Sequence, residues 1–199
     1  LTREAAEEDP RQARDIAKTL DSGQTVDQQL VGTHYRDQSF GGGALDATVF
    51  YSWRDFEQQL PFPGSSLINY QRDYYAGSVE YSRITDLAGK PLNWVVGTDL
   101  AWQEDDRGRH EGNADGEVVS RTADELQQAR SIGIFAQGEW SLTEKLALSA
   151  GVRHDQVDME IDDDFFADGS DDSGDRTFRE WSGSVGLSYQ YRPAHQWYA

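Results

Sequence analysis

A two-residue alternation of apolar with polar or small side chains runs through most of this chain. Residues 131–140, 146–153 and 181–191 show it most regularly. Because successive side chains of a β-strand point to opposite faces, each such segment has one apolar and one polar face. The segments extend to about ten residues or more, which is the length of a transmembrane strand and longer than the average strand of a soluble protein.

Eight strands are expected, joined by connections that alternate in length. The turns at 41–43, 86–91, 143–145 and 192–195 are short, whereas 58–66, 107–125 and 162–176 are expected to be long loops. Such an alternation is typical of an outer-membrane barrel, with tight turns at one rim and long loops at the other. The expected strands are 26–38, 44–56, 67–84, 92–106, 126–141, 145–161, 177–191 and 196–199.

The composition agrees with a sheet that has lipid on one side. Only 37% of the residues are hydrophobic, yet there are 6 Trp, 9 Tyr and 8 Phe, too many aromatic residues for a disordered chain. A transmembrane barrel needs apolar residues only at alternate strand positions, because its interior is polar. Charged residues such as Asp46, Arg54, Asp99, Glu139 and Arg153 fall on the polar faces of their segments.

Charge and residue types exclude several classes of function. The formal net charge of −18 makes nucleic-acid binding implausible, because phosphate recognition needs a basic face. There is no cysteine, the four histidines are widely spaced, and no nucleophile motif of the form Gly-x-Ser-x-Gly occurs. The chain is therefore expected to be neither an enzyme nor a holder of a resident metal or cofactor.

The expected long loops contain the candidate ligand-binding residues. Arg107, Arg109 and His110 could meet an anionic iron chelate, because Arg presents a fork of donors to carboxylates; the alternative is local pairing with nearby acidic residues. Phe165 and Phe166 could close over a ligand or simply anchor their loop. The Asp-rich run 162–175 lacks the spacing of an EF-hand and is interpreted as a solvated, mobile loop rather than a cation site.

Residues 130–155 carry a resemblance to a known family. They read RSIGIFAQ at 130–137, then Trp140, Leu142, Leu146 and Leu148, and then GVRHD at 151–155. This hairpin resembles that of TonB-dependent outer-membrane receptors, with His154 where Tyr is usual. Segments 44–56, 96–100 and 182–189 are similar to other strands of the family, so that the likeness covers residues 26–199.

The resemblance implies an all-β fold, an antiparallel up-and-down segment of a larger transmembrane barrel of about 22 strands. It also implies a location in the outer membrane of a Gram-negative bacterium and energy-coupled import of a ferric siderophore or similar nutrient. The implied partners are outer-membrane lipid, the iron chelate and the TonB complex, which would act through a plug domain that is absent here. The chain is therefore expected to be an internal piece of a longer protein.

The domain expectation is a long surface loop over residues 1–25, with a short helix around 11–20, followed by a barrel segment over 26–199. Two other interpretations remain open. The eight strands could close into a small structural or adhesive barrel, or the chain could be a soluble β-sandwich with an acidic cation-binding loop. Apolar faces that are buried in a dry core would favour the sandwich.

Overall fold

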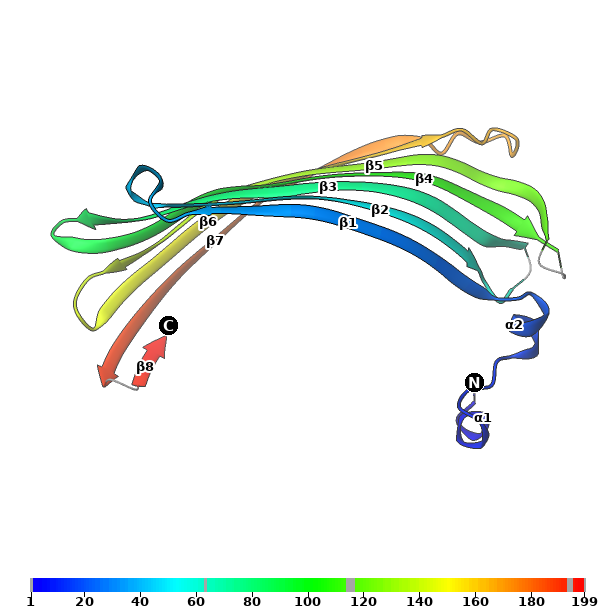
Figure 1. Ribbon diagram of the computed structural model, residues 1–199, viewed down its shortest axis with the longest axis horizontal. Coiled ribbons are helices and arrows are strands. Elements are labelled where there is room, and N and C mark those ends of the chain that lie inside the picture. Colours follow the sequence, from blue (N-terminus) through cyan, green and yellow to red (C-terminus); the bar gives the residue numbers. More distant parts are fainter. Residues whose placement is uncertain (1, 63, 114–116, 193–194, 199) are drawn as a thin grey trace.

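The chain folds into one arched antiparallel sheet preceded by two short helices, as a computed structural model shows (Figure 1). The structure describes residues 2–62, 64–113, 117–192 and 195–198. The helices are α1 (Arg3–Glu8) and α2 (Asp15–Thr19), and a 3-10 turn, η1, covers Phe40–Gly42. The strands are β1 (Gly23–Asp37), β2 (Ala44–Gln59), β3 (Gly64–Leu87), β4 (Lys90–Gly112), β5 (Val118–Ser141), β6 (Leu146–Asp163), β7 (Gly174–Arg192) and β8 (His195–Tyr198).

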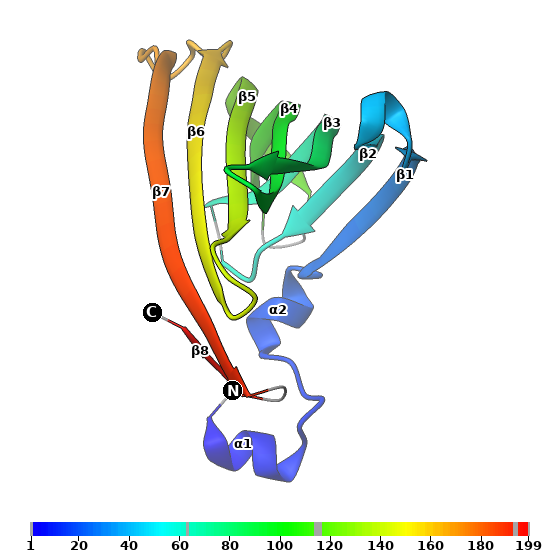
Figure 2. The ribbon, with the colours of Figure 1, turned by 90° about the vertical axis from the view of Figure 1, so that its left-hand side faces the viewer.

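Each strand pairs with the next strand in sequence, so the sheet is an up-and-down meander from β1 to β8. This confirms the predicted fold class. The end that joins β1 to β2, β3 to β4 and β5 to β6 is called the turn end below, and the opposite end the loop end. At the turn end, Ala88 and Gly89 have φ of 55° and 75°, the geometry of a type I′ hairpin turn. The two helices lie at the loop end (Figure 1), on the open side of the arch (Figures 1 and 2).

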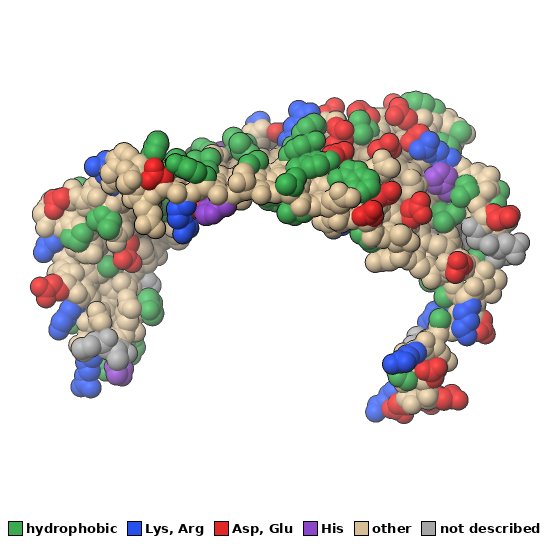
Figure 3. All heavy atoms as spheres, viewed as in Figure 1, with side chains coloured by type: hydrophobic (Ala, Val, Ile, Leu, Met, Phe, Trp, Pro, Cys, Tyr) green, Lys and Arg blue, Asp and Glu red, His purple; other side chains and the backbone are tan. Residues whose placement is uncertain are grey.

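The register places the apolar positions of neighbouring strands opposite one another, as the alternation predicts. One cross-strand row consists of Tyr81, Val96, Ala136 and Val152. A row on the other face consists of His34, Thr48, Ser78 and Asp99. The apolar face is the convex side of the arch, where hydrophobic side chains gather (Figure 3), and the polar face is the concave side.

Aromatic side chains border the convex apolar belt at both ends. Toward the loop end, the rings of Tyr75 and Trp102 stack with their centroids 5.4 Å apart, beside Tyr51. Toward the turn end, Tyr81 lies edge-on to Trp94, and Trp140 Nε1 donates to the Leu87 carbonyl at 3.2 Å. Amphipathic rings favour membrane interfaces, so the belt between these two rows has the form of a lipid-facing surface.

A single layer of sheet leaves this belt uncovered by protein. The side chains of Val185, Trp181 and Ile134 are 79%, 66% and 49% exposed, and Leu20 is the one buried hydrophobic residue in the part of the chain that the structure describes. The described residues form no dry core of the kind a soluble sandwich needs. Among the described residues, β1 pairs only with β2 and β8 only with β7, so these eight strands do not close into a small barrel.

The prediction of long loops at 58–66 and 107–125 is wrong. β2 continues to Gln59 and β3 begins at Gly64, while β4 runs to Gly112 and β5 begins at Val118. Strands β3, β4 and β5 therefore extend far past the apolar belt, where both faces meet water and the apolar alternation stops although backbone pairing continues. Residues 114–116 of the expected second loop, the turn residues 193–194 and Ala199 lie outside the described residues.

The N-terminal segment contains the two helices within the residues expected to form a surface loop. Thr2 caps α1 by accepting a hydrogen bond from the Ala5 amide at 3.2 Å, and α2 lies within the stretch expected to be helical. No helix in the described part of the chain is long and apolar enough to cross a membrane.

Candidate functional site

Four arginines gather on the concave face at the loop end. Between residues 52–58, 68–74 and 103–109, alternate positions of β2, β3 and β4 face this side of the sheet, and they include a single carboxylate, that of Asp105. The arginines are Arg54, Arg72, Arg107 and Arg109. This region is therefore a local cationic surface in a chain whose net charge is −18.

Arg72 is held by the one carboxylate of this surface. Its Nε and Nη2 atoms donate to the two carboxylate oxygens of Asp105 at 2.7 and 2.6 Å, and Asp105 is only 4% exposed. Gln103 donates to the same carboxylate at 3.3 Å. The hydrogen bonds that Arg72 donates to Asp105 raise the pKa of Arg72 above its ordinary value. A bidentate pair of this kind fixes the plane of the guanidinium.

Arg54 and two aromatic rings extend the surface toward β1. Arg54 donates to the Gln28 amide oxygen from Nε and Nη2, at 3.0 and 2.6 Å, and its Nη1 lies 3.4 Å from the Tyr70 hydroxyl. The rings of Phe56 and Tyr70 stack, with centroids 4.8 Å apart. The Arg72 Cζ atom lies 5.0 Å from the centroid of Tyr70. The result is an aromatic shelf flanked by two guanidinium groups.

Two of the residues singled out from the sequence belong to this surface, although they lie on strand β4 and not on a loop. Arg107 stands in the same cross-strand row as Tyr70 and reaches Glu125 across the sheet, with 3.8 Å between Nη1 and Oε2. That partner lies on β5 and is not one of the sequence neighbours expected to pair with it. Arg109 has no ion pair within the described ranges, and its side chain is half-buried.

His110 does not join these arginines. A Cβ built on Gly108 would lie 3.1 Å from the His110 Cε1 atom, so the imidazole lies on the face of Gly108, opposite to that of Arg107 and Arg109. The sequence placed the three residues together on a flexible loop, where no such separation of faces is imposed. The pairing of β4 with both neighbours imposes it here.

Phe165 and Phe166 lie on the connection between β6 and β7, as expected. Phe166 is 61% exposed and Phe165 is half-buried. The connection starts after Asp163, which belongs to the same cross-strand row as Glu125 and Arg107. The two rings therefore lie at the same end of the sheet as the arginines, two strands away from β4.

The Asp-rich connection is organised by its own carboxylates. The buried carboxylate of Asp163 accepts hydrogen bonds from the backbone amides of Phe165 and Asp172, at 2.9 and 3.1 Å. The Asp171 carboxylate accepts hydrogen bonds from the hydroxyl group and the backbone amide of Ser173. These bonds lower the pKa of Asp171 below its usual range. No group of three or more His, Asp or Glu that could hold a metal ion is found among the described residues.

A second polar cluster lies deeper on the concave face. Arg153 on β6 donates to Asp99 on β4, with 2.7 Å between Nη1 and Oδ2, and to Asp155 at 2.9 Å from Nε. It crosses β5 at Gly133, which has no side chain to block it. Near the turn end, Asp46 binds both His34 and Arg36.

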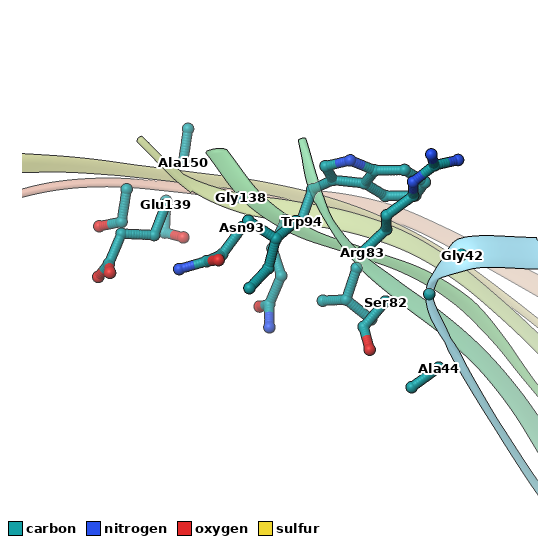
Figure 4. A pocket seen from close by; sticks show the side chains of 15 residues that line it. Gly42, Ala44, Ser82, Arg83, Asn93, Trp94, Gly138, Glu139 and Ala150 are labelled. Atoms are coloured by element: carbon teal, nitrogen blue, oxygen red, sulfur yellow. The ribbon is translucent and has the colours of Figure 1, made fainter. Parts of the chain in front are cut away.

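Below this cluster the concave face is hollowed near the turn end. The hollow has a volume of about 900 Å³ and is lined by polar side chains such as Ser82, Asn93 and Glu139 together with apolar ones such as Ile84 and Val95. Figure 4 shows the three polar side chains on one side of the ribbons, with Trp94 and Arg83 on the other side. Charged and polar side chains thus recur along the concave face, from the arginines at the loop end to this hollow, with apolar side chains such as Phe56 and Phe135 between them.

The residues that surround Tyr70 are not among the binding residues that the sequence predicts. The alternation places Arg54 on a polar strand face, but it does not connect Arg54 with Arg72 or with the two rings. The signal that could have found them is the presence of arginine on the polar phase of three successive strands. Reading it requires the strand register, which brings Arg54, Arg72 and Asp105 into one row.

Comparison with known proteins places this fold in a family. The family described as TonB dependent receptor-like, beta-barrel, matches residues 4–199. Among solved structures, the chain is similar to the ferric citrate transporter FecA in its unliganded form (TM-score 0.74, 12% identity), covering 89% of this chain and 27% of FecA. It is also similar to the siderophore receptor PiuA from Acinetobacter baumannii (TM-score 0.69, 12% identity), covering 87% of this chain and 31% of PiuA.

A third similar structure is the open form of the ferric-catecholate import receptor Fiu from E. coli K12 (TM-score 0.70, 10% identity), with 89% of this chain and 35% of Fiu covered. The chain thus spans about a third or less of the length of these receptors. At such identities the structural likeness establishes the fold alone. The sequence match over nearly the whole chain establishes more: the chain belongs to the TonB-dependent receptor family, as part of its β-barrel domain.

Proposed function

We propose that the protein to which this segment belongs binds and imports a ferric siderophore or a similar anionic metal chelate across the outer membrane of a Gram-negative bacterium. The family consists of transport receptors. The observation that carries the proposal is the aromatic shelf of Phe56 and Tyr70, flanked by Arg54 and Arg72 and extended by Arg109. Guanidinium groups bind carboxylates and other oxyanions bidentately, and the aromatic faces supply apolar contact area.

The titles of similar structures support this ligand class. They name ferric citrate, ferric catecholate and ferric yersiniabactin as the cargo of those receptors. In this proposal the loop end faces the cell exterior, because outer-membrane barrels have short periplasmic turns and extend further on the extracellular side, as β3, β4 and β5 do at the loop end. The segment supplies barrel wall and part of the outer rim. Lipid covers the convex belt, and the TonB complex acts through a plug domain.

The unpaired cations distinguish this surface from a purely structural network. Arg72 is occupied by Asp105, whereas Arg54 binds only neutral groups and Arg109 has no ion pair among the described residues. A buried or half-buried guanidinium without a carboxylate partner retains its capacity to bind an anion. We therefore assign first contact with the chelate to Arg54 and Arg109, and a positioning role to Arg72.

The test uses the full-length receptor with ferric citrate and a ferric catecholate as probes. Replacing Arg54 or Arg109 with glutamine is expected to weaken binding of at least one probe about tenfold, because a hydrogen bond to a charged group contributes about 1.5–3 kcal/mol. Dissociation constants come from quenching of tryptophan fluorescence, and uptake from radioactive iron in iron-starved cells.

The matched control is Arg130→Gln. Arg130 lies on the convex face, where its Nη2 donates to Gln128 at 3.0 Å. Its replacement removes one positive charge from the same sheet without touching the concave surface, so binding is expected to stay at the wild-type value. Equal loss in all three variants, or failure of the wild-type receptor to bind either probe, would overturn the proposal.

A further inference from the structure

A hollow in the convex face lies where four strands cross the apolar belt. One cross-strand row runs through Trp94, Gly138, Ala150 and Val185, so that two small residues stand between two large ones. Together with Ala136 and Gly183 in the next row, these small residues form the floor of a hollow of about 590 Å³. We call it the apolar trough. It is lined almost wholly by carbon, and it faces the lipid side of the sheet.

Large side chains close the trough toward both ends of the sheet. On the turn-end side the adjacent row is Leu92, Trp140, Leu148 and Leu187. On the loop-end side, beyond the row that contains Val96 and Val152, lie Ile134, His154 and Trp181, the last two with rings stacked 4.4 Å apart. The trough is therefore a bounded depression that extends across strands β5 and β6, and not a furrow that runs the height of the belt.

A cation stands at one end of the row that forms the trough. Arg83 on β3 is directly opposite Trp94, and Figure 4 shows both side chains on the same side of the ribbons as Ala150. Arg83 is exposed and makes no ion pair with any residue that the structure describes. Guanidinium groups pair with phosphate in a bidentate manner, and tryptophan favours the membrane interface.

The row from Arg83 to Val185 also changes depth in the membrane. On β3 the outward aromatic positions end at Tyr81, and only Thr85 and Leu87 follow Arg83 on this face before the turn, so Arg83 lies at the turn-end border of the belt. On β7 they extend from Trp181 to Tyr191, so Val185 lies within the belt. Because the strands are tilted, the row leads from the interface at Arg83 to the interior of the bilayer at Val185. The phosphate and an acyl chain of one lipid follow each other in the same order, from the interface to the bilayer interior.

We propose that the trough and Arg83 form a binding site for one anionic glycerophospholipid of the leaflet at the turn end. The guanidinium of Arg83 binds the phosphate, and the indole of Trp94 lies beside the glycerol. One acyl chain occupies the trough over Gly138 and Ala150 and fills the space that these small residues leave open. The charge of Arg83 and the apolar lining together select a lipid that has both groups.

The test measures lipid retained by the purified full-length receptor. Detergent-solubilised receptor is mixed with phosphatidylglycerol and examined by native mass spectrometry. Arg83→Gln removes the phosphate ligand and Ala150→Leu fills the trough, and each is expected to reduce retention of phosphatidylglycerol about tenfold. Ala47→Leu, on the convex face of β2 outside the trough, and Arg130→Gln are the matched controls, and both are expected to retain lipid as the wild type does.

Three results would overturn the site. They are equal retention in all variants, retention that falls only in the controls, and preferential retention of lipid A over phosphatidylglycerol by the wild type. If Ala150→Leu prevents folding, Arg83→Gln decides the question alone, because it changes an exposed side chain. The readout involves neither chelate binding nor uptake, so its outcome is independent of the proposed transport function.

Discussion

The guanidinium of Arg153 occupies the space above strand β5 that a side chain at Gly133 would fill: a Cβ built on Gly133 would clash with the Arg153 Nη2 atom. Through this opening Arg153 reaches from β6 to Asp99 on β4, a contact that bridges two strands that are not neighbours. Phe135 supports the guanidinium from the side, with 5.7 Å between its ring centroid and Cζ. The absence of a side chain at Gly133 thus allows one ion pair to connect β6 with β4 across β5.

The first prediction concerns that opening. Gly133→Val is expected to displace Arg153, break its contact with Asp99 and lower the free energy of unfolding by about 1–3 kcal/mol, the usual cost of overpacking. Unfolding in urea, followed by tryptophan fluorescence of the refolded full-length receptor, measures the change. Gly174→Ala is the control, because a Cβ there meets nothing within 4 Å. Equal stability of Gly133→Val and the control would show that Arg153 has another route.

A second prediction concerns the buried carboxylate of Asp105. Arg72→Met is expected to reduce stability by about 3 kcal/mol, because it leaves an uncompensated buried charge. The double variant Arg72→Met with Asp105→Leu is expected to recover much of the loss, since no charge then stays buried. A double-mutant cycle by urea unfolding measures both. Additive losses in the double variant would contradict an interaction between these side chains.

The pH dependence of the contact between β6 and β7 supplies a third prediction. Hydrogen bonds from Thr177 and Gln156, at 2.6 and 2.8 Å, hold the pKa of Asp158 below its usual range, at a point outside the apolar belt. A lowered folded-state pKa contributes stability above the unfolded-state pKa of about 3.9, and this stability is lost as the pH falls through the folded value. Asp158→Ala should therefore be less stable than wild type at pH 7.

As the pH falls below about 3.9, the two proteins should become equally stable, because protonation removes the same interaction from the wild type. Urea midpoints measured from pH 7 to pH 2 test this. Asp162→Ala, which alters an exposed carboxylate on the same strand, is the control and should show no such convergence. A difference between wild type and Asp158→Ala that stays constant down to pH 2 would refute the assignment.

The fourth prediction concerns order in the connection between β6 and β7. Asp163→Ala removes the acceptor of the Phe165 and Asp172 amides and is expected to increase hydrogen exchange across residues 164–173 about tenfold or more. Exchange is followed by mass spectrometry of peptides from the full-length receptor. Asp168→Ala serves for comparison, because Asp168 accepts only a local bond from Ser170 and its loss should affect fewer amides. Unchanged exchange in Asp163→Ala would mean that other contacts order the connection.

Alternation alone determined the fold class, the identity of the two faces and the assignment of charges to the concave side. Ser131, Gly133 and Phe135 share one phase of β5, and Ile132 and Ile134 share the other, so the faces follow from the period-two geometry of any strand. The turn at Ala88 and Gly89 is similarly local. These features need no knowledge of distant residues, which is why the amino-acid sequence predicts them.

Tertiary structure decided which side chains meet across the strands, because this depends on the register. It also decided which stretches are strands where both faces of the sheet meet water. Past the apolar belt, a strand with water on each side has the composition of a loop, and this is why the sequence predicts a loop around Arg107 and Arg109. Only pairing with β3 and β5 shows that it is a strand and directs His110 away from the two arginines. The same pairing assembles Arg54, Tyr70 and Arg72 from segments that are independent in the sequence, because contacts between strands are set by the register and not by the spacing along the chain.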